Sequence, residues 1–308
     1  MLSVEAPERK AVRTAVLIIT HNSAEDIDCL LDSLVEVGDP LTIVVDNASA
    51  DETVSRLSQR RNVRCIEAGG NLGYAGGINK GMLHMPRDCD ILLLNPDLTV
   101  MPGTIQHMRT ALDADPSLGI VVPKILNTDG GLFHSLRREP SLLRMLGDAL
   151  FGALLRGRPG CLSETVWEER AYSKPHEVDW ATGAAMLISA RCVNALGDWD
   201  ERFFLYSEET DYARRAREDG FRIKYVPDAR VQHRGGGSGG SDELASLLAL
   251  NRVRYVRKWR GGPYASLFHA LAFLHEVVRI HQPEHRAGAR ALWRGWVNLP
   301  GVGVIARP

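Results

Sequence analysis

Acidic side chains at the ends of apolar runs are the residues of this sequence best placed to do chemistry. Asp97 follows the apolar residues 92–94 through Asn95 and Pro96, and Asp46 ends a second apolar run. Both carboxylates would close buried strands, and the carboxyl edge of such a sheet is where α/β proteins place ligands. Asn95-Pro96-Asp97 could equally be an ordinary turn, and Asp46 could equally cap a following helix. Each motif alone is therefore weak evidence for a site.

A second group of candidates lies later in the chain. Glu208, Glu209 and Asp211 begin a predicted helix over residues 208–219, where acidic side chains suit the helix dipole. One of them could instead be a general base near a bound hydroxyl. His233, after a predicted strand, is either a packed histidine or a metal ligand. At Asp46 a carboxylate could accept the N3–H of a pyrimidine base.

Glycines at positions 69, 70, 73, 76 and 77 form a dense stretch after the third predicted strand. A Walker loop would need Gly-Lys-Ser/Thr, and a Rossmann fingerprint would follow the first strand, so neither motif is present. Such glycines serve either simple turns or the close approach of backbone to a ligand, which Asn71 and Asn79 could support. Acids, one histidine and glycines together suit a nucleotide diphosphate held through a hard cation and an activated hydroxyl.

Strands alternate with helices in the first part of the chain, which predicts a mostly parallel sheet with helices on both faces. The predicted strands span residues 14–20, 41–46, 63–66, 91–95, 119–124, 178–189, 221–226 and 229–232. Helices are expected after the first three strands, after Pro102 and over 208–219. Residues 127–176 look like a variable insertion or lid with one helix near 142–155.

The chain divides by composition into three parts. Residues 1–13 form a polar tail, and residues 14–240 form the α/β body, with a first half to residue 100 and a second from 101. The six residues 235–240 are glycine-rich and flexible by composition. Residues 241–308 form a C-terminal helical appendage, with amphipathic helices predicted over 242–259 and 264–280.

Overall composition excludes several classes. Lys and Arg number 37 against 38 Asp and Glu, so no basic field points to nucleic acid. The N-terminus lacks the apolar core of a secretory signal, and no apolar run reaches the ~18 residues of a membrane span. Five cysteines lie far apart without a CxxC pair, which suits reduced, packed thiols. We therefore expect a cytoplasmic protein; the oligomeric state stays open, with a homodimer as one option.

Seven motifs in this order resemble family 2 inverting glycosyltransferases, in the bacterial rhamnosyl- and galactofuranosyltransferase-like branch. The motifs are residues 20–22 (THN), 45–51 (VDNASAD), 71–79 (NLGYAGGIN), 94–97 (LNPD), 180–186 (WATGAAM), 203–211 (FFLYSEETD) and 231–233 (VQH). The resemblance covers about residues 14–235. It implies a GT-A fold, a dTDP- or UDP-sugar donor and a divalent cation, Mg²⁺ or Mn²⁺. A deoxyhexose such as rhamnose is the favoured sugar, and polysaccharide or cell-wall synthesis the favoured setting.

The resemblance also implies roles for individual residues. Asp46 would contact the base and Asp97, at the end of the family's DxD-type element, would hold the metal with help from His233. Glu209 would be the base, with Glu208 or Asp211 as alternatives because relatives usually carry Asp at position 209. The donor-binding residues would be Thr20, Asn22, Asp46, Asn47, Asn71, Gly73, Asn79 and Asn95.

Three departures from the family pattern stand out: Asn95 at the first DxD position, Glu209 one methylene longer than Asp, and His21 in place of Tyr. Arginines over residues 251–258 resemble the helix that follows this core in the rhamnosyltransferase-like branch. They could hold a polyprenyl-diphosphate-linked or other glycan acceptor or anionic headgroups at the inner face of the cell membrane, or they could be a solvated basic face. Two alternatives remain: a sugar-nucleotide pyrophosphorylase, and a non-catalytic sugar-nucleotide-binding protein.

Overall fold

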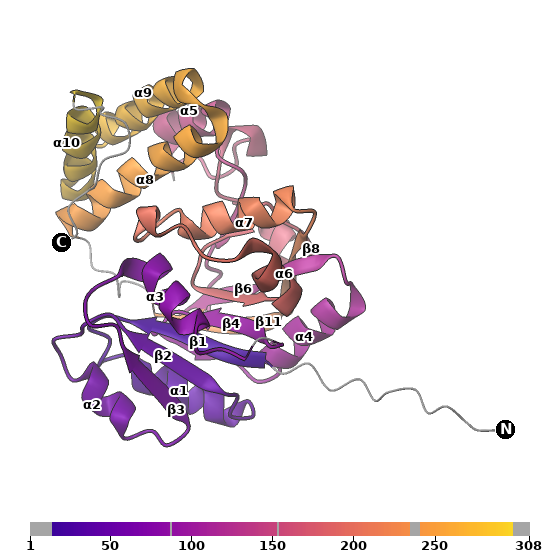
Figure 1. Ribbon diagram of the computed structural model, residues 1–308. Coiled ribbons are helices and arrows are strands. Elements are labelled where there is room, and N and C mark those ends of the chain that lie inside the picture. Colours follow the sequence, from indigo (N-terminus) through magenta and orange to yellow (C-terminus); the bar gives the residue numbers. More distant parts are fainter. Residues whose placement is uncertain (1–13, 87, 153, 235–240, 298–308) are drawn as a thin grey trace.

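A large mixed sheet forms the centre of the computed structural model, which describes residues 14–86, 88–152, 154–234 and 241–297 (Figure 1). Within these residues the sheet has nine strands, in the order β3-β2-β1-β4-β10-β6-β11-β5, with β8 paired to β11. Its strands are β1 (Thr14–Thr20), β2 (Thr42–Asp46), β3 (Val63–Glu67), β4 (Asp90–Leu94), β5 (Leu98–Val100), β6 (Leu118–Asn127), β8 (His176–Glu177), β10 (Ala185–Ile188) and β11 (Arg222–His233). A separate pair joins β7 (Leu136–Arg137) to β9 (Trp180–Ala181).

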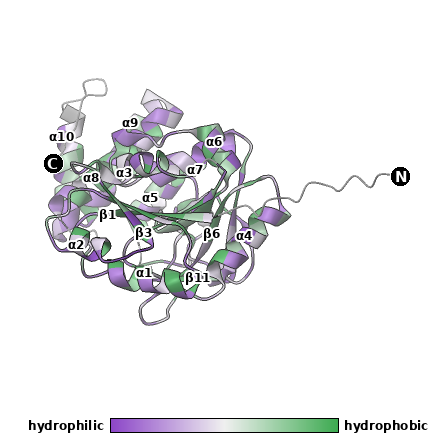
Figure 2. Cartoon of the chain, turned by 60° about the horizontal axis from the view of Figure 1, so that its bottom comes forward, coloured by the Kyte–Doolittle hydropathy of each residue, from purple (hydrophilic) through white to green (hydrophobic). Residues whose placement is uncertain are grey.

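The mostly parallel sheet that the sequence predicted is confirmed. Strands β3, β2, β1 and β4 are parallel to one another, and β6 is parallel to β11. Strand β10 runs antiparallel between β4 and β6, and β5 runs antiparallel along β11. Every apolar residue of β1, β2 and β4 is buried, as expected of strands covered on both faces. Figure 2 shows these central strands as hydrophobic.

Helices cover both faces of the sheet. On one face lie α1 (Ile27–Glu36), α2 (Thr53–Ser58) and α4 (Thr104–Ala114), and on the other lie α3 (Gly73–Met82), α6 (Ala190–Leu196) and α7 (Glu208–Glu218). A third layer lies beyond α7 (Figure 1). It contains α5 (Leu142–Phe151), α8 (Asp242–Arg260), α9 (Gly262–Val278) and α10 (Pro283–Val297), packed around Phe203 and Phe268. Short 3-10 turns occur at Gly160–Leu162, Glu169–Tyr172 and Glu201–Phe203.

Several boundaries differ from the sequence prediction. The expected strand 178–189 is interrupted between β9 and β10, whereas the two expected strands at 221–232 are one strand, β11, with a register shift between Val226 and Arg230. Helix α10 was not predicted, because its buried face is made largely of small residues, Ala287 and Ala289, which give a weak periodic signal. Cys29 and Cys161 are exposed, so the prediction that all cysteines are packed was wrong for these two.

The glycine-rich stretch is largely helical, since α3 already begins at Gly73. Its glycines bring the helix close to β1: a Cβ on Gly77 would lie 2.7 Å from Cγ2 of Ile19. Gly73 has a φ of +72°, and a Cβ there would lie 2.4 Å from the carbonyl oxygen of Phe204. Close packing between elements therefore accounts for these glycines, where the sequence left a ligand loop open.

None of the helices formed by the described residues has the length and apolar character required to cross a membrane. The polar tail at 1–13 and the glycine-rich residues 235–240 lie outside the described residues, as do 298–308. The domain boundary drawn at residue 240 therefore remains a prediction.

Candidate active site

Asp46 is held rigidly at the carboxyl end of β2. Its carboxylate accepts hydrogen bonds from Oγ1 of Thr20 (2.9 Å), the backbone N–H of Ser49 (2.9 Å) and Oγ of Ser49 (2.5 Å). It does not cap α2, which begins at Thr53, where Asp51 accepts the Thr53 N–H instead. The capping alternative for Asp46 is thus wrong, and its buried carboxylate lies at the carboxyl end of β2.

The asparagines of the sequence prediction fall into two groups. Asn22, with φ of 52°, accepts the Ala50 N–H at 2.8 Å and so ties the loops after β1 and β2 together. Asn47 donates to the Gly73 carbonyl at 2.8 Å while its buried Oδ1 has no partner, and Asn71 accepts the Gly73 N–H at 3.0 Å. These three, like Thr20, surround the β1–β2–α3 edge where Asp46 lies. An acceptor such as Asn47 Oδ1 without a partner marks a place where a ligand donor would fit.

Asn79 has a different task. Its amide oxygen accepts the Trp199 N–H at 2.8 Å, and its amide nitrogen donates to the Trp199 carbonyl at 2.9 Å and to Glu201 at 3.0 Å. Both the oxygen and the nitrogen of the Asn79 side chain are therefore bonded within the protein. Asn79 links α3 to the segment before α7 and has no unpartnered side-chain atom left to contact the sugar nucleotide.

Asp97 and His233 lie together, although 136 positions separate them in the sequence. Pairing of β5 with β11 sets His233 opposite Leu98, and Nε2 of His233 lies 3.0 Å from Oδ2 of Asp97. Both side chains are largely buried, and Asn95 precedes them at the same edge, with its N–H bonded to the Ala184 carbonyl. A carboxylate oxygen beside an imidazole nitrogen is a donor set that fits Mn²⁺, or Mg²⁺ with further oxygen ligands.

Asp26, just before α1, is a further carboxylate near this pair. Its side chain does not cap α1; it forms an ion pair of 2.7 Å with Arg234, directly after His233. Burial raises the pKa of Asp26, and the nearby negative charge of Asp97 raises it further, while Arg234 opposes both. The edge therefore gathers Asp26, Asp97 and His233, with one arginine adjacent.

Glu208 and Glu209 begin α7 and differ in environment. Glu208 is almost fully buried, and burial together with the charge of Glu209 raises its pKa well above the usual value. Burial also raises the pKa of Glu209, but backbone N–H groups, among them that of Gly183, and the guanidinium of Arg137 act in the opposite direction. Glu209 therefore ionises first, while Glu208 retains its proton to higher pH.

The remaining hydrogen-bonding capacity of this pair also favours Glu209 as the base. Oε2 of each carboxylate has no partner among the described residues, yet Glu209 as a whole is partly exposed whereas Glu208 is not. Tyr74 lies beside the pair: its hydroxyl donates to the Gly183 carbonyl at 3.0 Å. Burial raises the pKa of Tyr74, and the negative charges of Glu208, Glu209 and Asp97 raise it further, so all three acids lie near its hydroxyl.

Asp211, the third candidate base, is occupied elsewhere. Two positions along a helix rotate a side chain by about 200°, so Asp211 points away from Glu209. It is fully buried and pairs with Nζ of Lys258 at 2.6 Å, with Nε of Arg215 at 3.2 Å and with the Trp259 indole at 2.9 Å. We correct the expectation that it could be the base: Asp211 anchors α7 to α8.

The segment directly before α7 has unusual backbone conformations. Phe204, Tyr206 and Ser207 all have positive φ, at 62°, 69° and 69°. Such conformations cost free energy for residues other than glycine and persist only where the surroundings enforce them. The Phe204 carbonyl accepts the N–H of Tyr74 at 2.6 Å, so the strained segment also touches the start of α3.

Asn251 of α8 is the residue that enforces this conformation. Its side chain is fully buried, and its amide nitrogen donates to the carbonyls of Phe203 (2.5 Å), Leu205 (2.8 Å) and Tyr206 (3.2 Å). The C-terminal helical region, which the sequence suggested was an appendage, therefore helps to shape the segment that leads to Glu209. Sequence reasoning counted Asn251 only as the start of a basic stretch.

Replacing Asn251 with Asp should lower both stability and kcat. An aspartate has the same shape but cannot donate, so the carbonyls of Leu205 and Tyr206 lose this partner, at about 1–3 kcal/mol for each that stays dry, while the Phe203 carbonyl still accepts the Leu205 N–H. Thermal unfolding and steady-state kinetics, measured well below the lower Tm, would show this. Ser246→Ala is the matched control: it is partly buried on the same helix, and its hydroxyl bonds the carbonyls of Asp242 and Ala287. A variant with normal kcat would show that Asn251 does not position Glu209.

Solved structures with the same fold are glycosyltransferases. GalNAc-T7 with UDP, GalNAc and Mn²⁺ superimposes with a TM-score of 0.62 at 17% identity, over 85% of this chain and 51% of that one. The mannosyltransferase PcManGT of Pyrobaculum calidifontis, with GDP-Man and Mn²⁺, gives 0.55 at 18% identity, over 95% and 77%. The chain therefore has the GT-A fold of the glycosyltransferases.

Sequence comparison narrows the class further. Residues 15–163 match the family model of glycosyl transferase family 2. The N-acetylglucosaminyl-diphospho-decaprenol L-rhamnosyltransferase of Mycobacterium tuberculosis is 29% identical over 254 residues, which cover 78% of this chain and 82% of that one. Residues 15–163 thus match glycosyl transferase family 2, and the family resemblance predicted from the motifs is confirmed.

Proposed function

We propose that this glycosyltransferase is inverting and metal-dependent, and that it transfers a deoxyhexose such as rhamnose from a dTDP- or UDP-sugar to a glycan hydroxyl. The observation that carries the proposal is that two carboxylate sites, Asp97 beside His233 and the Glu208–Glu209 pair, both lie near enough to Tyr74 for their charges to raise its pKa. One site suits the donor diphosphate and the other suits a hydroxyl to be deprotonated. Similarity to an L-rhamnosyltransferase supports the choice of sugar.

The donor nucleotide would lie along the β1–β2–α3 edge. Asp46 would accept the N3–H of uracil or thymine through a carboxylate that Thr20 and Ser49 already orient. Asn22, Asn47, Asn71 and Gly73 line the same edge, and Asn95 lies nearer to Asp97. Because uracil and thymine present the same N3–H, these residues support both bases equally.

Asp97 and His233 would hold the divalent cation, Mg²⁺ or Mn²⁺, with Asp26 close by. When bound, such a cation neutralises charge on the leaving nucleotide diphosphate. Arg234, which pairs with Asp26 at 2.7 Å, would be available to a phosphate oxygen of the donor.

Glu209 would take the proton of the acceptor hydroxyl through its free Oε2. The hydroxyl oxygen would attack the anomeric carbon as the bond to the diphosphate oxygen breaks, which inverts the configuration in one displacement. Because burial and the charge of Glu209 raise the pKa of Glu208 well above its usual value, Glu208 would carry less negative charge beside the incoming oxygen than Glu209. Glu209 and the anomeric carbon must lie on opposite sides of the hydroxyl for this transfer.

A panel of dTDP-, UDP- and GDP-sugars tests the donor assignment. A ligand that binds only the native state raises its apparent stability, so dTDP- or UDP-deoxyhexoses with Mg²⁺ or Mn²⁺ should raise Tm most. GDP-sugars are the matched control, because guanine presents a different edge to Asp46. A larger shift with GDP-sugars would contradict the assignment, and so would shifts that persist unchanged in EDTA.

We further propose that the acceptor is lipid-linked, at the cytoplasmic face of a membrane, and that the third layer contacts the lipid. The name of the mycobacterial relative specifies a diphospho-decaprenol acceptor, which supports this proposal. Exposed apolar side chains lie on this layer and on the turns after α5 and α9, namely Leu143, Leu150, Leu154, Leu155, Leu248, Leu267, Val277, Val278, Ile280 and Trp293.

A vesicle flotation assay tests this membrane contact. The protein should be enriched on anionic vesicles over neutral ones. Equal recovery on both would count against contact through the basic residues of 251–258.

A non-catalytic sugar-nucleotide-binding protein is the alternative that geometry alone leaves open. The pyrophosphorylase alternative has no support from the family assignment. Turnover of a donor by the unmodified chain, lost on replacing Glu209, separates the transferase from the binding protein.

A further inference from the structure

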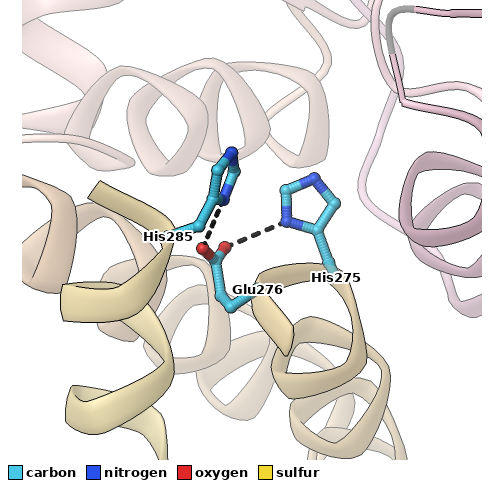
Figure 3. A group of neighbouring side chains, drawn as sticks. All are labelled: His275, Glu276 and His285. Atoms are coloured by element: carbon cyan, nitrogen blue, oxygen red, sulfur yellow. Dashed lines mark hydrogen bonds and ion pairs between the residues drawn. The ribbon is translucent and has the colours of Figure 1, made fainter. Parts of the chain in front are cut away.

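A cluster of two histidines and one glutamate joins α9 to α10, in the third layer and apart from the catalytic edge (Figure 3). His275 and Glu276 lie near the end of α9, and His285 lies in the first turn of α10. Nδ1 of His275 is 2.9 Å from Oε1 of Glu276, and Nδ1 of His285 is 2.7 Å from Oε2. One carboxylate thus bridges two imidazoles whose other nitrogens point away from it.

We propose that His275, Glu276 and His285 form a binding site for a transition-metal dication, best suited to Zn²⁺, that links α9 to α10. One potential donor atom from each residue lies within 4.8 Å of the other two. Two imidazole nitrogens and one carboxylate oxygen are the donor set of many three-ligand zinc sites, whereas Mg²⁺ prefers oxygen alone. A water molecule would complete a tetrahedral shell.

The three donor atoms must move closer together to bind the ion. Two donors bound at the usual ~2.0–2.1 Å from a tetrahedral Zn²⁺ lie about 3.3 Å apart, whereas the donor atoms here lie within 4.8 Å of one another, a difference that side-chain rotation can close. An imidazole that donates its Nδ1–H to the carboxylate can bind metal through Nδ1 once that proton has moved to Nε2 or to solvent. Side-chain exposures of 17%, 13% and 19% leave the cluster reachable from solvent.

Electrostatics support a deprotonated donor set. Burial lowers the pKa of His275, and so do the charges of Arg252 and Arg279, while the hydrogen bond to Glu276 opposes them. Burial alone would raise the pKa of Glu276, but the hydrogen bonds from both histidines more than offset it. The negative carboxylate and a neutral imidazole are the protonation states that a metal requires.

Two guanidinium groups face the cluster and oppose a cation. Arg252 of α8 pairs with Glu164 at 2.7 Å, and Arg279 donates to the carbonyls of Asp148, Ala149 and His275. Both are therefore engaged away from the bridging carboxylate. Gly288 of α10 faces Glu276: a Cβ there would lie 2.9 Å from Oε2, so its absence lets the carboxylate sit between the two helices.

The test uses the full chain, stripped with EDTA and then dialysed against ZnCl₂ or CoCl₂. We expect about one Zn²⁺ per chain, a visible absorption band for the Co²⁺ form, and a higher Tm with Zn²⁺ than with Mg²⁺. Loss of an outer-shell partner typically weakens metal affinity ~10–100-fold, so removing a direct ligand in His285→Asn should cost at least ~10-fold. Glu276→Gln should act likewise and keeps the side-chain shape if His285→Asn folds poorly.

Two controls locate the ion. His281→Asn changes an exposed histidine just before α10 and should leave Zn²⁺ affinity unchanged. Asp97→Asn changes the proposed donor-cation site and should also retain Zn²⁺, which separates this site from the proposed catalytic function. Failure of the wild type to retain Zn²⁺, equal retention by His285→Asn, or loss on Asp97→Asn alone would each overturn the proposal.

Discussion

Replacing Glu209 with glutamine should lower kcat about 10²- to 10⁴-fold, the usual contribution of a positioned general base, while nucleotide affinity stays unchanged. Glutamine keeps the shape and the hydrogen bond from Gly183 but cannot take a proton from the acceptor. Steady-state kinetics with a matched donor, together with a nucleotide titration, measures both quantities. Unchanged turnover would remove Glu209 as the base.

The matched control is Glu208→Gln. Because Glu208 is buried and holds its proton to higher pH than Glu209, a neutral glutamine reproduces its ordinary state, and kcat should fall little. If Glu208→Gln instead abolished turnover and Glu209→Gln did not, the roles would be exchanged. This comparison is possible because the two acids are neighbours in the sequence, and Glu208 is buried whereas Glu209 is partly exposed.

The pH profile provides an independent check on the same assignment. A base works only when ionised, and burial raises the pKa of Glu209, so kcat should fall as pH drops through a value above the ~4.3 of an ordinary glutamate. The observed value belongs to the pair, since two adjacent carboxyls titrate together. In Glu208→Gln the acid limb should persist, whereas the residual activity of Glu209→Gln should lack it.

Sequence reasoning anticipated the first half of the chain well because its strands are long apolar runs with turn signals between them. The contact between Asp97 and His233 was anticipated from the order of motifs, but the element that creates it was not. Strand β5 has three residues, too few for a periodic signal, and only its pairing with β11 brings the two side chains together.

Contacts across long sequence separations set the limit of prediction. Asp211 shares a motif with Glu209, yet helical rotation turns it toward Lys258, 47 positions later. The residues around Asn251 in the sequence do not indicate that its amide hydrogen-bonds to carbonyls 45 to 48 positions earlier. Both contacts lead to α8, so the C-terminal helices form part of the framework of the site, which composition alone could not reveal.

Replacing Asp97 with asparagine should weaken metal-dependent nucleotide binding by at least ~10-fold, because a hard dication loses its charged oxygen ligand and Asn95 leaves no second carboxylate in that motif. Calorimetric titration with Mg²⁺ or Mn²⁺ and in EDTA separates the two states. Without metal, wild type and variant should bind equally, since the base contact through Asp46 is untouched.

Two comparisons decide which side chains share the cation with Asp97. His233→Asn should weaken binding with Mn²⁺ more than with Mg²⁺, because an imidazole suits the former better. Asp26→Asn removes the neighbouring carboxylate that pairs with Arg234, and a comparable loss there would make Asp26 a ligand of the ion. An unchanged affinity in Asp97→Asn would instead move the diphosphate away from the carboxyl ends of β4 and β11.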